Sequence, residues 1–172
     1  MITLDSLFML SVGQAPLDLQ SFDCGRETVT NFFRNEAQAY QDELFGKTYF
    51  YVHPDNPTDV IAGFTVANAS IFTKHFGVDN KYKGNHLGEQ IIEFVTKWFT
   101  NNRNKSGCRH LIVDAYNEAK LIDYYQRNGL NLFFSTIEQE MKYRNWNSEK
   151  DGELETRLMY RDLILLRRNT IR

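Results

Sequence analysis

Cysteine is scarce in this chain of 172 residues, where only Cys24 and Cys108 occur. Two cysteines so far apart form neither a metal-ligand spacing nor a disulfide framework, so we expect free thiols and a cytoplasmic protein. No apolar run approaches the roughly 18–20 residues that a membrane span requires. The N-terminus lacks a basic segment followed by an apolar stretch, so we expect neither a signal peptide nor a membrane partner.

A strong charge of either sign is also missing. The formal net charge is −2 at pH 7, so the overall charge does not indicate a nucleic-acid partner. Several arginines do occur near the C-terminus: Arg161, Arg167, Arg168 and Arg172. A solvated tail is the simpler interpretation of this group, and an RNA contact is the alternative.

Apolar residues are well represented, at 42% of the chain with 14% aromatic. This composition predicts a globular protein rather than a disordered one. The length suits one domain over residues 1–172, with a core at about 8–165. The 13 Phe and 9 Tyr usually fill a core, but they would also permit an apolar interface, so a homodimer or a dimerisation scaffold is left open.

Hydrophobic periodicity predicts strands and helices in alternation. The expected strands cover residues 8–12, 47–53, 58–71, a strand ending at 78, 109–115, 132–135 and 156–165. The expected helices cover residues 26–44, 86–101 and 118–128, with one or two further turns at 137–143. Gly46 and Gly129 are expected to end two of these helices, and residues 148–153 are expected to form a charged loop.

The most informative segment runs from Phe76 to Gly88, FGVDNKYKGNHLG. It predicts the end of a strand, a polar turn, a Gly-containing loop and a helix with an apolar face formed by Leu87, Ile91, Ile92, Phe94, Val95 and Trp98. The first N–H groups of a helix lack helical partners, and the helix dipole adds positive potential there. We therefore predict an anion site for a phosphate-containing ligand.

Neither of two common phosphate loops fits this segment. Gly84 and Gly88 are too close together for a P-loop, and a dinucleotide loop needs three glycines. Lys83 to Gly88 instead resembles the pyrophosphate loop of the GNAT (GCN5-related N-acetyltransferase) superfamily, Gln/Arg-x-x-Gly-x-Gly/Ala. Two positions depart from that pattern, because Lys83 replaces Gln or Arg and His86 replaces the first glycine.

Two other segments also resemble this superfamily. Val113 to Leu130 is similar to its signature Val-Asp-Ala-x-Asn-x-x-Ala followed by Tyr-x-x-x-Gly-Phe. Ser21 to Gly25 resembles the Phe-Asp-Cys-Gly opening of one branch, which includes tRNA-acetylating toxins that pair with ribbon-helix-helix antitoxins. The resemblance covers roughly residues 20–164.

The resemblance implies an α/β (α+β) GNAT fold: a central, mixed, mostly antiparallel twisted sheet flanked by helices, with strands four and five splayed apart. It implies acetyl-CoA as cosubstrate, no metal, and Tyr125 as the general acid that protonates the leaving sulfur. The implied cofactor-binding residues lie in strand four, in the loop and after the next strand: Phe76, Gly77, Val78, Lys83, Gly84, Asn85, His86, Leu87, Gly88 and Asn117.

Several of these side chains have simpler interpretations. His86 would crowd the phosphate, donate a hydrogen bond to it, or be an exposed residue at a helix start. Asn117 suits a helix N-cap, and Tyr125 shares helical spacing with core residues. The general base is not identified by the sequence, and its candidates are His75 and, more weakly, His110 and Glu118.

The predicted activity is transfer of an acetyl group from acetyl-CoA to a primary amine by direct attack. One alternative is a toxin that acetylates aminoacyl-tRNA. Another is a non-catalytic acyl-CoA-binding or interaction module, motivated by His86 and by a short region at Phe72 to His75. That region leaves little room for the long fourth strand of the family. Either the protein has a natural deletion there or a flexible loop is missing from the sequence, and we hypothesise the second.

Overall fold

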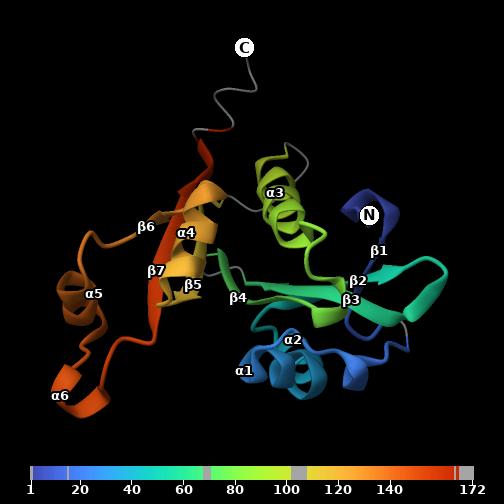
Figure 1. Ribbon diagram of the computed structural model, residues 1–172, viewed down its shortest axis with the longest axis horizontal. Helices are drawn as coiled ribbons and strands as arrows, with labels where there is room; N and C mark the ends of the chain where they lie inside the picture. The colour runs from blue at the N-terminus through green and yellow to red at the C-terminus, as the bar shows by residue number, and fades with distance from the viewer. Residues whose placement is uncertain (1, 15, 68–70, 102–107, 165, 167–172) are drawn as a thin grey trace. The chain divides into compact units, whose positions relative to one another are not determined.

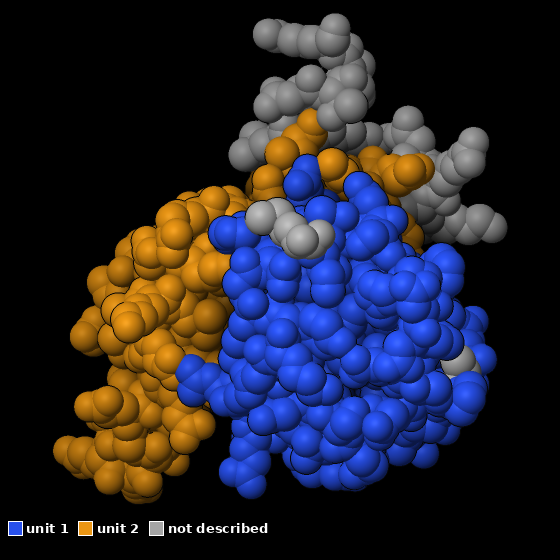
Figure 2. Space-filling model, turned by 45° about the vertical axis from the view of Figure 1, so that its right-hand side comes forward, with its two compact units in different colours: residues 1–69, 73–95 blue, residues 70–72, 96–172 orange. Residues whose placement is uncertain are grey.

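The computed structural model describes residues 2–14, 16–67, 71–101, 108–164 and 166 (Figure 1). The chain divides into two compact units (Figure 2): unit 1 contains residues 1–69 and 73–95, and unit 2 contains residues 70–72 and 96–172. The single domain expected from the chain length stays a prediction. No helix within the described ranges is long and apolar enough to cross a membrane.

Unit 1 contains antiparallel strands in the order β1-β2-β3-β4. Their bounds are Phe8–Ser11, Lys47–His53, Asn56–Val66 and Ile71–Val78. Phe50 in β2 and Phe64 in β3 are both fully buried, and they pack on opposite faces of these strands. The strands therefore have a core on each side, which explains their near-continuous apolar sequence.

Helices cover both faces of β2 and β3 (Figure 1). On one face lie α1 (Glu27–Asn31) and α2 (Ala37–Asp42), joined by a π-helical turn at Phe32–Glu36. Phe33 of that turn meets Phe50 with ring centroids 5.4 Å apart. On the other face, Phe94 of α3 (Leu87–Thr100) meets Tyr51 at 6.1 Å. The continuous helix predicted at 26–44 is thus interrupted by the π-helical turn.

The predicted end of that helix at Gly46 is wrong. Leu44 adopts the left-handed conformation with φ of 60°, and the Phe45 N–H donates to the Tyr40 carbonyl at 3.1 Å, which closes the helix earlier. Gly46 is needed for a different reason. A Cβ atom there would lie 2.8 Å from the Val66 carbonyl oxygen, so the two main chains approach too closely for a side chain.

The hypothesis of a shortened fourth strand is also wrong. β3 ends at Val66 rather than at residue 71, and β4 runs from Ile71 to Val78, pairing with β3 as far as Ala62 and Val78. A full strand is therefore built from the region around Phe72 to His75, and the reason for proposing a missing loop disappears.

Unit 2 contains antiparallel strands in the order β5-β7-β6. Their bounds are His110–Tyr116, Thr156–Asp162 and Asn131–Leu132, so β6 is shorter than predicted. α4 (Ala119–Arg127) packs on β5. Gly129 has φ of 80° and the Leu130 N–H donates to the Tyr125 carbonyl at 3.1 Å, which confirms Gly129 as the residue that ends this helix.

Two short helices precede β7. α5 spans Ile137–Arg144, which confirms the predicted turns, and α6 spans Ser148–Asp151. The charged loop predicted at 148–153 is therefore partly helical. Its N-cap is Asn147, whose side chain accepts the Glu149 N–H at 3.0 Å.

Arg161 does not belong to a solvated tail. It lies in β7, and its Nη1 donates to the Asn128 carbonyl at 3.3 Å. Arg167, Arg168 and Arg172 lie outside the described residues, as does the polar loop expected at 102–107. Both cysteines are unpaired.

Candidate functional site

The loop before α3 contains two consecutive reversals of the main chain. Gly84 has φ of 84° and His86 has φ of 56°, and α3 begins at Leu87. Among the residues that the structure describes, no group accepts a hydrogen bond from any main-chain N–H between Gly84 and Glu89. Such a run of free donors at a helix start is what an anion site requires.

His86 adopts the conformation that glycine provides at low cost. Histidine tolerates the left-handed region better than most residues. The side chain is 67% exposed and its Nδ1 lies 2.9 Å from Glu89 Oε2. Glu89 places a negative charge in the first turn of α3, which opposes phosphate binding there.

The Asn85 side chain forms hydrogen bonds with two main-chain groups and so stabilises the loop. Its Nδ2 donates to the Tyr82 carbonyl at 3.0 Å, and its Oδ1 accepts the Ile2 N–H at 3.2 Å. Gln90 similarly accepts the Leu4 N–H at 2.8 Å. The Asn85 side chain is therefore held by other main-chain groups, while no described group accepts its main-chain N–H.

Three other predicted loop residues differ in the groups that they present to a ligand: Lys83, Leu87 and Gly88. Lys83 is exposed, and its Nζ lies 3.0 Å from the position that a Cβ atom would occupy at Gly25. Leu87 is 1% exposed, so its side chain belongs to the core and only its N–H faces the loop. Gly88 is half-buried in the first turn of α3.

The predicted strand-four residues lie in β4, where Phe76, Gly77 and Val78 pair with β3. A Cβ atom at Gly77 would lie 2.9 Å from Cys24 Cβ, so Cys24 requires glycine at this point of the strand. The Phe22–Gly25 segment therefore touches β4 as well as Lys83. The sequence identified this segment only as a mark of one family branch and gave no sign of these contacts.

Tyr125 in unit 2 combines a buried ring with an available oxygen. The side chain is 7% exposed, and burial raises the pKa of Tyr125, with a smaller contribution from Tyr124. Within the described part of the chain its hydroxyl has no hydrogen-bond partner, and only Tyr51 has an unpartnered hydroxyl that is fully enclosed. A core ring and a proton donor are therefore compatible roles for Tyr125.

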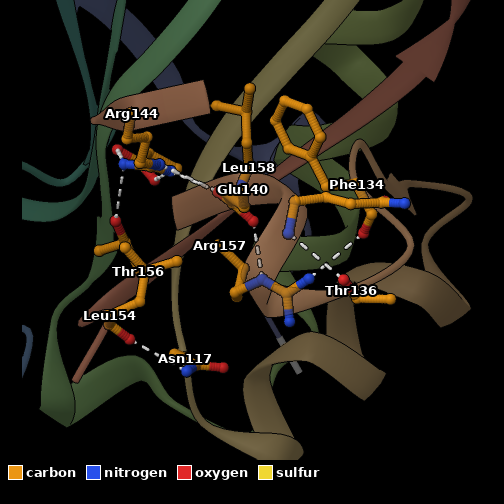
Figure 3. Close-up of polar contacts among 11 residues, drawn as sticks. Asn117, Phe134, Thr136, Glu140, Arg144, Leu154, Thr156, Arg157 and Leu158 are labelled. Atoms are coloured by element: carbon orange, nitrogen blue, oxygen red, sulfur yellow. Dashed lines mark hydrogen bonds and ion pairs between the residues drawn. The ribbon is translucent and has the colours of Figure 1, made fainter. Parts of the chain in front are cut away.

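Asn117 is not the helix N-cap, which is Glu118. The Asn117 Nδ2 donates to the Leu154 carbonyl at 3.0 Å (Figure 3), and its N–H donates to the Glu155 carbonyl at 2.8 Å. These two bonds fasten the end of β5 to the segment that precedes β7, and they explain why the side chain does not cap α4.

The candidate bases lie in different surroundings. His75 stacks on Phe32 with ring centroids 3.5 Å apart, His110 Nε2 lies 4.0 Å from Asp162 Oδ2, and Glu118 is exposed. None of these positions identifies a general base. The described residues hold no group of His, Cys, Asp and Glu side chains that could bind a metal ion.

No protein-family model and no curated protein sequence matches the chain. Solved structures do. A Tyr-to-Phe mutant of KacT has a TM-score of 0.74 at 15% identity, over 95% of this chain and 99% of that one. The AtaT mutant toxin bound to the C-terminus of the antitoxin AtaR and acetyl-CoA has a TM-score of 0.74 at 14% identity, over 98% and 100%. AtaT complexed with acetyl-methionyl-tRNAfMet has a TM-score of 0.74 at 14% identity, over 95% and 99%.

At these identities the likeness establishes the fold alone. The mixed α/β fold with antiparallel strands flanked by helices, predicted from the resemblance, is confirmed. The splay of strands four and five stays a prediction, as do the ligand-binding and catalytic roles of the residues described above.

Proposed function

We propose that this protein is an acyltransferase that moves an acetyl group from acetyl-CoA to a primary amine. The observation that carries the proposal is the run of free N–H groups from Gly84 to Glu89 at the start of a helix of 14 residues. Its support is the fold, which the chain shares with a toxin whose structure contains acetyl-CoA.

The loop is proposed to hold the pyrophosphate of the cosubstrate. Main-chain donors and the α3 dipole stabilise an anion without a dedicated cation. Lys83 would add a point charge, which is less directional than an arginine fork. The main chain of Phe76, Gly77 and Val78 would pair with pantetheine. Asn117 would contact the cosubstrate through its side-chain oxygen, because its side-chain nitrogen donates to the Leu154 carbonyl.

Tyr125 is proposed to stabilise the leaving thiolate. The neutral amine nitrogen attacks the thioester carbonyl and the carbon–nitrogen bond forms as the carbon–sulfur bond breaks. The nitrogen loses a proton to solvent, and the thiolate takes up a proton from solvent to leave as the thiol. A free thiol has a pKa of about 8.5, below the raised pKa of Tyr125. The phenol therefore stays protonated at neutral pH, and it assists by donating a hydrogen bond to the developing negative charge on sulfur.

A toxin that acetylates the amino group of an aminoacyl-tRNA is the more specific form of this proposal. Its support is the Phe-Asp-Cys-Gly segment and the likeness to AtaT, whose structures contain an antitoxin segment and an acetylated tRNA. In that case the partners are aminoacyl-tRNA and a ribbon-helix-helix antitoxin, and the cytoplasm is the location.

A non-catalytic acyl-CoA-binding or interaction module is the second candidate. It is favoured by the carboxylate of Glu89, which pairs with His86 at the helix start, since a negative charge there reduces the attraction of this loop for phosphate. This candidate predicts acetyl-CoA binding without turnover, or no binding.

Turnover separates these candidates. The protein is incubated with acetyl-CoA and either small amines, lysine peptides or methionyl-tRNA, and both free thiol and acetylated product are measured. We expect product with at least one acceptor class, and a loss of about 10²–10⁴ in rate for Tyr125→Phe. Tyr124→Phe is the matched control and should keep its rate. Acetyl-CoA binding without product for every acceptor class would contradict the enzyme proposal.

A further inference from the structure

Asp79 joins the end of β4 to the Phe22–Gly25 segment. Its Oδ2 accepts the Asp23 N–H at 2.8 Å, and the Asn80 N–H donates back to the Asp23 carbonyl at 2.7 Å. Its Oδ1 accepts the Lys81 N–H at 2.9 Å. One carboxylate thus fastens two segments that are 56 residues apart in the sequence.

This carboxylate is held by main-chain groups rather than by a cation. Asp79 is 1% exposed, and among the described residues no lysine or arginine pairs with it. A buried carboxylate is costly unless hydrogen bonds satisfy it. Since its donors are the N–H groups of Asp23 and Lys81, the side chain joins the main chain of the Phe22–Gly25 segment to that of the turn after β4.

The Phe22–Gly25 segment is itself firmly placed. Phe22 is fully buried, and its carbonyl accepts Arg34 Nε at 2.8 Å. The Gly25 N–H donates to Asp23 Oδ1 at 2.7 Å, and Cys24 packs against Gly77. The segment is therefore a fixed support against which Asp79 can hold the loop.

We infer that Asp79 is a positioning residue for the pyrophosphate loop, and that the Phe22–Gly25 segment acts on cosubstrate affinity through it. The inference rests on the proposed function. Asp79 stands five positions before Gly84, outside the run of free donors, and its buried carboxylate is fully engaged, so it does not bind the ligand itself. Donors that are already in place lose little freedom on binding, so a loosened loop binds its anion more weakly.

The test replaces the carboxylate by an amide of the same size. In Asp79→Asn one of the two acceptor oxygens becomes an NH2 group, which cannot accept the N–H of Asp23 or Lys81. The matched control is Asp18→Asn. Asp18 is exposed and is also the N-cap of a 3-10 turn, where it accepts the Ser21 N–H at 3.3 Å, but it does not touch the loop.

Binding of two ligands distinguishes a positioning role of Asp79 from a general loss of structure. The folded proteins are titrated by NMR with acetyl-CoA and with S-acetylpantetheine, which lacks the pyrophosphate. For Asp79→Asn we expect acetyl-CoA affinity to fall about tenfold, while S-acetylpantetheine affinity changes less than about twofold. Asp18→Asn should bind both ligands as the wild type does.

The possible failures are distinguishable. If the wild-type protein does not bind acetyl-CoA, both the proposed function and the positioning role of Asp79 are wrong. If the wild type binds and Asp79→Asn binds equally, or if the variant loses both ligands to the same degree, only the positioning role is wrong.

A second variant serves if Asp79→Asn does not fold. Gly25 is exposed with φ of 79°, and an added Cβ would lie 2.9 Å from Asn80 Oδ1. Alanine is strained at this φ, and its methyl would also displace the Asn80 side chain. Gly25→Ala should therefore shift the Phe22–Gly25 segment and weaken acetyl-CoA binding selectively. Its control is Gly152→Ala, which has φ of 76° but open space around the Cβ position. Wild-type affinity in Gly25→Ala would overturn the inference.

Discussion

Each unit of this protein buries a carboxylate, and the two are satisfied in different ways. In unit 2, Glu140 is fully buried and accepts hydrogen bonds from Arg157 Nε at 2.7 Å and Arg144 Nη2 at 2.6 Å (Figure 3), besides one from the Leu158 N–H at 2.6 Å. In unit 1, Asp79 is held by main-chain N–H groups. The first arrangement joins side chains of α5 and β7, whereas the second fixes the course of a loop. The comparison predicts that Glu140 supports stability and that Asp79 supports ligand affinity.

Removing the charge of Glu140 is expected to have the largest effect. Glu140→Gln leaves the buried Arg157 guanidinium without a full partner, and losing one member of a buried pair costs about 3–5 kcal/mol of unfolding free energy. Denaturant unfolding measures this loss. Glu138→Gln is the control, since Glu138 is an exposed residue of the same helix. Acetyl-CoA affinity should be unchanged while the variant is folded. A selective loss of affinity would contradict the assignment of Glu140 to stability and Asp79 to ligand affinity.

Gly77→Ala tests the packing of the Phe22–Gly25 segment against β4. The added methyl would meet Cys24 Cβ at 2.9 Å, and overpacking of this kind costs about 1–3 kcal/mol. Cys24→Gly removes the opposing atom, so the double variant should recover part of the lost stability in a double-mutant cycle. Additive losses would show that the contact does not fix β4.

His86→Gly tests whether the left-handed conformation of His86 lowers the stability of the protein. The left-handed conformation of a non-glycine residue costs about 1–2 kcal/mol, so we expect a small gain in thermal stability, reduced by the lost contact with Glu89. Asn145→Gly is the control, because Asn145 is left-handed as well but ends α5. A loss of stability in His86→Gly would mean that its pairing with Glu89 outweighs the strain.

High salt is expected to distinguish a carboxylate that pairs with an exposed arginine from one that is held by a main-chain N–H group. The hydrogen bond from Arg109 lowers the pKa of Asp162, and the Gly25 N–H lowers the pKa of Asp23. A lowered pKa stabilises the fold above the ordinary value of 3.8, and that contribution is lost as the pH falls through the folded-state pKa. Because ions screen exposed charges, NMR titration in high salt should raise the pKa of Asp162 more than that of Asp23. Equal shifts would contradict this distinction.

Local signals in the sequence were sufficient to predict the loop and the end of α4. Gly84 and the apolar face of α3 identify a loop before a helix, and Gly129 follows α4 directly. The signature around Tyr125 likewise gave a correct helix, because its spacing is local. The fold followed from the resemblance rather than from these signals alone.

Non-local contacts could not be predicted. The burial of Glu140 in the polar sequence of α5 depends on Arg157, and the burial of Asp79 depends on Asp23 far earlier in the chain. A helix cap was the simpler interpretation of Asn117 because Asn suits that position, but its side chain donates to the Leu154 carbonyl instead. In each case the decisive partner is distant in the sequence.

The central claim is that the loop from Gly84 to Glu89 binds the pyrophosphate of acetyl-CoA. Calorimetric titration of acetyl-CoA into the wild-type protein and Gly88→Trp tests it most directly, with Lys97→Trp, an exposed position on α3, as control. We expect the wild type and Lys97→Trp to bind acetyl-CoA and Gly88→Trp to lose this binding. Undiminished binding in Gly88→Trp, or no binding by the wild type, would contradict it.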